Sequence, residues 1–214
     1  MARKYSKKRM NKIEPAVMTL TFATPSSSSG IRSRSYVDLS QVASLVNRRF
    51  YRQGINWAVA GFKVTSLQAG TVSIMKLPNT WVMSNAWEKS FRTWQRMNNE
   101  ALEESDSVRP KFLDFKVYAD SDHHAAGFGA NLLPYSIAGG AVGVTAIPGE
   151  WVPSKIHVPI GNGATPSATF ERELIATGAN YPGPGASGND AVSLIEGYSA
   201  SRGLPDVLDP NAPS

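Results

Sequence analysis

The densest group of side chains that could do chemistry is the run Asp120-Ser121-Asp122-His123-His124. Carboxylates and imidazoles are ligands of Zn²⁺ and Mn²⁺, so Asp120, Asp122 and His124 are the candidate metal ligands. The same residue types are ordinary in a polar turn that follows a strand. The one remaining histidine, His157, lies far along the chain. We therefore expect a polar turn and no resident metal ion.

The familiar catalytic motifs are missing from the sequence. The chain has 214 residues and no Cys, which excludes a cysteine nucleophile, a disulfide scaffold and cysteine-based metal sites. There is no Walker loop, no H-E-x-x-H and no G-x-S-x-G. The stretch Gly127-Phe128-Gly129 begins like a dinucleotide-binding loop but lacks its third glycine. We expect a protein that is not an enzyme and that needs no cofactor.

Positive charge is concentrated at the N-terminal end of the chain. Residues 1–52 hold 11 basic and 2 acidic residues, a net charge of +9. Residues 53–214 hold 11 basic and 15 acidic residues, a net charge of −4. A dense run of like charges repels itself, so we predict that residues 1–15 form a disordered arm. The candidate nucleic-acid contacts in this arm are Arg3, Lys4, Lys7, Lys8, Arg9 and Lys12.

Such an arm favours a polyanionic partner, and nucleic acid is the commonest one. A solubilising tail or an import signal read by a host receptor is the alternative, and an import signal can coexist with nucleic-acid binding. Further arginines extend the candidate phosphate surface: Arg32, Arg34, Arg48, Arg49 and Arg52. The last three are predicted on the final turns of a helix capped by Ser40, where they would either complement the helix dipole or bind phosphate.

The elements that would position these residues are mainly strands. Alternating or β-rich segments are residues 16–22, 55–67, 71–77, 111–119, 151–159 and 168–176. Besides the helix after Ser40, a helix is predicted from Ala86 to about Glu104, because Trp87, Phe91 and Trp94 recur at helical spacing. Residues from Val192 onward favour a helix over a last strand. No apolar run of roughly 18 residues is present, so no membrane-spanning helix is expected.

These patterns favour a mainly all-β fold, an antiparallel single jelly-roll sandwich with one or two inserted helices. The sandwich is predicted in residues 16–205, between the disordered basic arm (1–15) and a linker-like tail (206–214). A jelly roll has about eight strands, and about six or seven are predicted here. Either the chain lacks the last strands of the fold, or strands lie unrecognised in the glycine-rich residues 127–149.

The amino-acid sequence of residues 36–66, 77–118 and 123–140 resembles that of capsid proteins of small circular single-stranded DNA viruses. These viruses are of the circovirus-like type found in environmental and marine samples. The resemblance extends over roughly residues 1–205. It implies a jelly roll whose copies self-assemble into an icosahedral shell around single-stranded DNA or RNA, with the basic arm on the inside. The implied location is the virion, with the host nucleus or cytoplasm during assembly.

Two other interpretations stay open on the residues alone. One is a cellular nucleic-acid-binding module, in which the basic tail tethers a small β-domain. The other is a sandwich-type enzyme or lectin that uses the loop at residues 120–124.

Overall fold

The structure is a computed structural model that describes residues 17–25, 32–67, 69–103, 114–136, 143–159 and 169–202. The predicted basic arm and the predicted tail lie outside these residues. The helices within them are α1 (Leu39–Asn47), α2 (Trp81–Ala101), α3 (Ser121–Ala126) and α4 (Leu194–Arg202), with a short 3-10 helix, η2, at Phe128–Ala130. The strands are β1 (Tyr135–Ser136), β2 (Val144–Thr145), β3 (Lys155–Pro159), β4 (Thr169–Ile175) and β5 (Ala191–Ser193).

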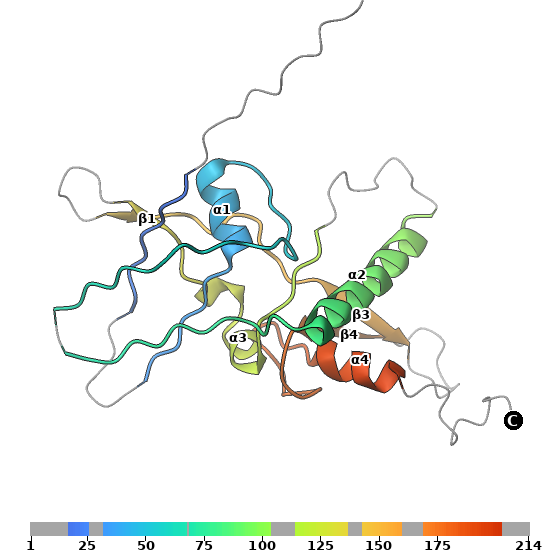
Figure 1. The fold of residues 1–214 in the computed structure, drawn as a ribbon. Helices are drawn as coiled ribbons and strands as arrows, with labels where there is room; N and C mark the ends of the chain where they lie inside the picture. Colours follow the sequence, from blue (N-terminus) through green and yellow to red (C-terminus); the bar gives the residue numbers. More distant parts are fainter. Residues whose placement is uncertain are drawn as a thin grey trace, which may run out of the picture.

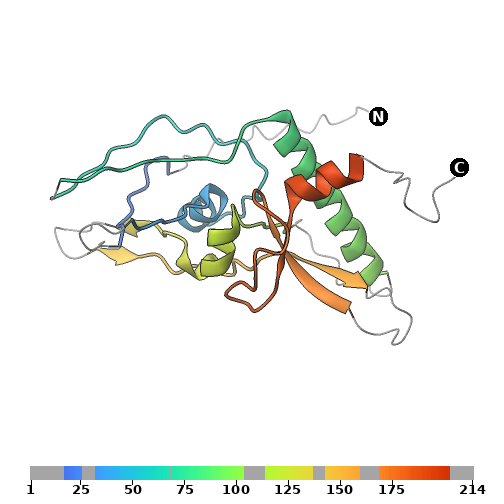
Figure 2. The same ribbon diagram turned by 90° about the horizontal axis from the view of Figure 1, so that it is seen from below.

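A three-stranded sheet in the order β3-β4-β5 lies at one end of the molecule. β3 runs antiparallel to β4, whereas β5 runs parallel to β4. The helices α2 and α4 pack on each other and lie over one face of this sheet (Figure 2). The main core fills the space between them with the buried residues Met83, Ala86, Phe91, Phe115, Val117, Leu174, Ala176 and Leu194.

The predicted antiparallel jelly-roll sandwich is wrong. The described residues hold five short strands in two separate sheets, and one strand pair is parallel. Helices α2 and α4 lie where a sandwich would place a second sheet. The predicted strands at residues 16–22, 55–67 and 71–77 are extended where they are described, but they belong to no strand ladder. Alternation of apolar and polar residues predicts an extended backbone. Only tertiary contacts decide whether that backbone pairs with another strand.

The helix predicted from the aromatic stripe is confirmed as α2. It begins at Trp81, earlier than expected, because the side chain of Thr80 accepts a hydrogen bond from the Met83 N–H at 3.3 Å and caps the first turn. The rings of Trp87 and Phe91 stack with their centroids 5.1 Å apart, and Phe115 packs against both rings. The stripe therefore supplies packing for the core, as its spacing predicted.

The helix predicted after Ser40 is also present, but both of its ends differ from the prediction. Asp38 is the N-cap, and its carboxylate accepts from the Ser40 N–H at 2.9 Å. The helix ends at Asn47, because the next residue, Arg48, has a left-handed φ of 50° that cannot continue an α-helix. Arg48, Arg49 and Arg52 therefore follow α1, and the prediction that they lie on its last turns is wrong.

The C-terminal half agrees better with the predicted elements. Residues 151–159 contain β3, which lies at the edge of its sheet as its two prolines indicated. Residues 168–176 contain β4. The predicted strand at 111–119 is reduced to an extended stretch in its described part, with one parallel bridge from Tyr118 to Ile175. The last described segment holds both a strand and a helix, β5 followed directly by α4.

Candidate functional site

The most unusual surface of the molecule is the extended stretch between α1 and α2. Residues 55–67 and 69–77, the projecting segment, run out to a tip and back, well away from the three-stranded sheet (Figures 1 and 2). All of these residues are exposed, including Phe62 at 67% and Met75 at 77% of full exposure. Its exposed large apolar residues are Ile55, Trp57, Val59, Phe62, Val64, Leu67, Val72, Ile74, Met75 and Leu77.

The projecting segment is anchored near its base through Trp57. The indole N–H of Trp57 donates to the Ser40 hydroxyl at 3.2 Å, and its ring packs edge-on against Tyr51 at 5.6 Å. Beyond this anchor, no described residue of the segment is part of a strand. An isolated pair of extended chains is marginally stable in water, because it buries little apolar surface. The segment therefore has the properties of a surface that needs a partner.

The charge of the projecting segment is low and of one sign. Lys63 and Lys76 are its charged residues, and the sequence contains no acid between Asp38 and Glu88. Its alternation also changes phase at Gly61, with Trp57 and Val59 on odd positions and Phe62 and Val64 on even positions. A strand with this pattern is apolar on both faces. The signal was in the sequence, but residues 55–67 and 71–77 were predicted as ordinary strands, and the exposed surface was missed.

The three candidate metal ligands are not brought together. The Asp120 carboxylate caps α3 by accepting from the His123 N–H at 2.9 Å, and it also accepts from the Tyr36 hydroxyl at 2.7 Å. Asp122 is exposed and pairs with Arg34. His124 points into the core. Within the described part of the chain, no group of three or more acidic or histidine residues could hold a metal ion.

His124 instead faces a buried carboxylate. Its Nε2 lies 3.0 Å from Oε2 of Glu173, and both side chains are at most 1% exposed. These two atoms are within ion-pair distance, but neither has a partner at hydrogen-bond geometry. The other carboxylate oxygen of Glu173 accepts from the Ser187 hydroxyl at 2.7 Å. Residues around Gly185 close over this pair, and a β-carbon at Gly185 would lie 2.5 Å from the His124 Nε2.

His123 belongs to a separate buried network. Its Nδ1 accepts from the Ala119 N–H at 3.1 Å, so Nε2 carries the proton and donates to Oδ1 of Asn131 at 2.7 Å. The Asn131 amide continues to Gln41 at 2.9 Å. Burial lowers the pKa of His123, because the charged imidazolium would lose its hydration. Tyr36 stacks on the imidazole, and burial together with Asp120 raises the pKa of its phenol to about 12.

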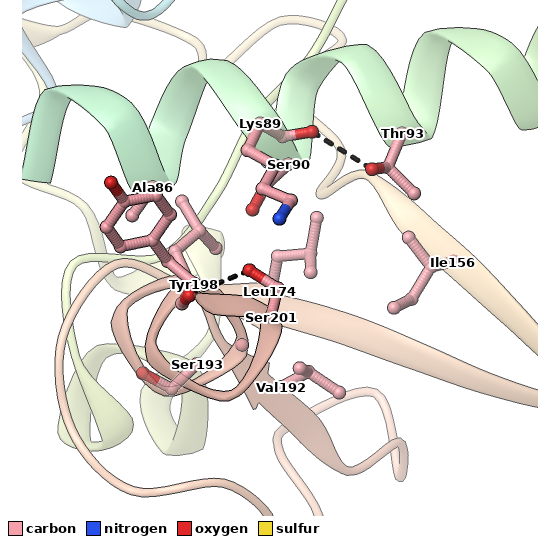
Figure 3. A pocket seen from close by; sticks show the side chains of 12 residues that line it. Ala86, Lys89, Ser90, Thr93, Ile156, Leu174, Val192, Ser193, Tyr198 and Ser201 are labelled. Carbon is pink, nitrogen blue, oxygen red and sulfur yellow. Dashed lines mark hydrogen bonds between the residues drawn. The ribbon is translucent and has the colours of Figure 1, made fainter. Parts of the chain in front are cut away.

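A pocket of about 250 Å³ lies between α2, α4 and the sheet (Figure 3). Its lining contains no acid and no histidine, and its one charged side chain is Lys89. The hydroxyls of Thr93 and Ser201 donate to backbone carbonyls of their own helices, at 3.0 and 2.7 Å. Lys89 and Tyr198 are the side chains of this lining whose types can take part in proton transfer.

The structure separates the second set of candidate arginines into two kinds. Arg34 pairs with Asp122 and lies 3.7 Å from Asp120, so its charge is already matched. Arg32, Arg48, Arg49 and Arg52 are exposed, and the Arg52 guanidinium lies 5.9 Å from the centre of the Phe91 ring. The six predicted contacts of the basic arm, from Arg3 to Lys12, lie outside the described residues.

No protein-family model, curated protein or solved structure matches this chain. None of its described helices is long and apolar enough to cross a membrane. The projecting segment and the uneven distribution of charge are therefore the features of this chain that bear on its function.

Proposed function

We propose that this chain is a non-enzymatic viral coat protein that self-assembles into a closed shell around single-stranded nucleic acid. Copies of the chain associate through apolar surface, and the basic N-terminal residues neutralise the packaged phosphates. The proposal joins the sequence resemblance to one structural observation, the exposure of the projecting segment.

The projecting segment supports self-assembly by its area. Ten large apolar side chains, each exposed by more than a third, offer on the order of 1,000 Å² of surface. A standard stable interface buries about 800 Å² from each partner. Apolar patches of this size on a monomer mark interaction sites, because leaving them in water is unfavourable. This surface is therefore sufficient for a stable interface between subunits.

The charge distribution supports nucleic acid as the cargo. The net charge of +9 in residues 1–52 contrasts with −4 in the remainder, so electrostatic attraction to phosphate is confined to one end. The predicted arm has Tyr5 as its one aromatic residue, so it offers little base stacking and no evident means of base readout. Binding is expected to be insensitive to base sequence and strongly sensitive to salt.

Size and nucleic-acid content test this proposal together. The full-length chain is purified and analysed by light scattering, negative-stain electron microscopy and the ratio of nucleic-acid to protein absorbance. Uniform particles that contain nucleic acid are the expected result. A variant with all six arm cations replaced by Gln keeps the same length, and it is expected to lose most of the nucleic acid while its folded domain persists.

Two results would contradict the proposal. A monomer or dimer that still binds nucleic acid would support the cellular module instead of a coat protein. A chain that neither assembles nor binds nucleic acid would remove both interpretations.

A further inference from the structure

A second apolar feature lies at the end of the molecule opposite the three-stranded sheet (Figure 1). Residues 17–25, α1 and the β1-β2 pair enclose a hollow of about 460 Å³. Its lining is uncharged and consists of Thr19, Leu20, Thr21, Leu45, Val46, Pro134, Tyr135, Ser136, Val144, Thr145, Ala146 and Ile147. Val144 is 75% exposed and Ile147 is 82% exposed, so the rim of the hollow is open to water.

The backbone around this hollow offers an open strand edge. β2 pairs with β1 on one side, and the described residues place no strand on its other side. Residues 17–25 are also extended, and they contact β1 through the bond from the Tyr135 N–H to the Thr21 carbonyl at 2.7 Å. An exposed strand edge readily accepts an extended chain, because the unpaired N–H and C=O groups can then form a ladder.

We propose that the projecting segment of one copy occupies this hollow in a second copy. This inference depends on the proposed function, because it names the surfaces through which subunits of the shell would meet. It adds the identity of the donor, residues 55–77, and of the acceptor, the hollow between residues 17–25, α1 and β1-β2.

The two surfaces match in chemistry. The donor is extended, apolar on both faces and charged only at Lys63 and Lys76. The acceptor is apolar and uncharged, so no positive charge opposes the lysines.

The occupant is a second copy rather than the segment of the same chain. All described residues of the projecting segment are exposed, so the segment does not fill the hollow of its own chain. Donor and acceptor are different surfaces, which makes the contact heterologous. Heterologous contacts extend from copy to copy and close into rings or shells where the rotation permits.

The absence of cysteine from the chain allows a direct test. One chain carries Phe62→Cys on the donor, and a second chain, distinguished by a size tag, carries Val144→Cys on the acceptor. The two are mixed under assembly conditions and oxidised mildly. A mixed disulfide between the two chains is expected, at a yield at least ten times that of the control in which Ser199→Cys replaces Val144→Cys. Ser199 is an exposed residue of α4.

The same experiment separates failure of this inference from failure of the proposed function. Particles that form while the Val144→Cys yield stays at the control level overturn the donor–acceptor contact and leave the coat function intact. A predominance of Phe62→Cys homodimers overturns it as well, because that result indicates contact between two donors. In a chain that carries both Phe62→Cys and Val144→Cys, a disulfide within one chain would show that the segment folds back onto its own hollow, which overturns the inference too. A chain that stays monomeric overturns both proposals.

A second variant tests the contact without crosslinking. Val144→Lys places a charge in the hollow at a side chain that is already largely exposed, so folding is expected to be unchanged. The concentration needed for assembly is expected to rise at least tenfold, whereas Ser199→Lys is expected to leave it unchanged. Equal assembly by both variants would contradict the inference.

Discussion

The backbone of Gly54 lies directly against the indole of Trp87: a β-carbon on Gly54 would be 2.5 Å from Cη2 and Cζ2 of that ring. Gly54 has φ of +83°, a conformation that side-chain-bearing residues rarely adopt. It is also the residue immediately before the projecting segment, while Trp87 lies in the aromatic core. This contact therefore ties the base of the exposed segment to the aromatic side chains that pack against the main core.

Replacing Gly54 with Ala is expected to destabilise the protein by about 2 kcal/mol or more, from left-handed strain and overlap with the indole together. Gly61→Ala is the matched control, because a β-carbon there meets nothing within 4 Å. Urea unfolding of both variants, followed by tryptophan fluorescence at a salt concentration that prevents assembly, measures the difference. Equal midpoints for the two variants would show that Trp87 moves aside easily.

Two phenylalanines are predicted to have opposite effects on folding and assembly. Phe91 is 7% exposed and packs on Trp87 and Phe115, so Phe91→Ala is expected to cost about 3–5 kcal/mol of unfolding free energy. Phe62 is 67% exposed, so Phe62→Ala is expected to change that free energy by less than about 0.5 kcal/mol. Light scattering is expected to show weaker assembly for Phe62→Ala. A large loss of stability in the Phe62 variant would mean that the projecting segment packs within its own chain.

Because His123 is buried, we expect the free energy of unfolding to depend on pH. Because burial lowers its pKa below the usual 6.5, the unfolded chain binds a proton at a higher pH than the folded chain does. The stabilisation from neutral His123 is thus complete above pH 6.5 and is lost as the pH falls through the lowered folded-state pKa.

The measurement is the unfolding free energy at about pH 7.5 and about pH 5.5 for His123→Gln and for the control His157→Gln. Between the two pH values, the His123→Gln variant is expected to lose less unfolding free energy than the wild-type chain, because Gln does not bind a proton. His157 is an exposed residue of β3, so its variant is expected to retain the wild-type pH dependence. Identical pH profiles for the two variants would exclude His123 as the titrating group.

The arginines are predicted to differ in how they contribute to nucleic-acid binding. If the six arm cations bind single-stranded phosphate, the slope of log K against log salt is expected to be about −4 from these residues. Replacing Arg48 and Arg49 with Gln together is expected to reduce the magnitude of the full slope by about 1.4, because both side chains are exposed. Arg34→Gln is expected to leave the slope unchanged, because Arg34 already pairs with Asp122.

Fluorescence anisotropy with a short single-stranded oligonucleotide, repeated over a series of salt concentrations, gives these slopes. A reduction in slope for Arg34→Gln as large as that for the double variant would show that phosphate displaces Asp122 from Arg34. Such a result would mean that Arg34 also binds nucleic-acid phosphate.

Local structure could be predicted where a residue pattern is compatible with only one type of secondary structure. The spacing of Trp87, Phe91 and Trp94 fits only one face of a helix, and α2 has that face in the core. The alternation of residues 168–176 predicted a strand, which is β4. Helix ends were less predictable, because Thr80 and Asp38 each compete with nearby residues that can also serve as caps.

The places of the candidate metal residues could not be predicted from their spacing. Asp122 and His124 are close in sequence, but α3 turns them in different directions, so one meets Arg34 at the surface and the other meets Glu173 in the core. Glu173 lies 49 positions further along the chain than His124, and no local pattern connects them. Proximity in sequence therefore does not bring these two side chains together in the fold.

The sequence by itself determined composition-level properties: the lack of cysteine chemistry, the basic N-terminal end, the aromatic helix and the extended character of residues 55–77. Tertiary structure decided which extended segments pair, that α2 and α4 cover the sheet, and that the projecting segment stays exposed. The physical reason is that backbone conformation follows from neighbouring residues, whereas strand partners, buried ion pairs and exposed surfaces depend on contacts between residues far apart in the chain.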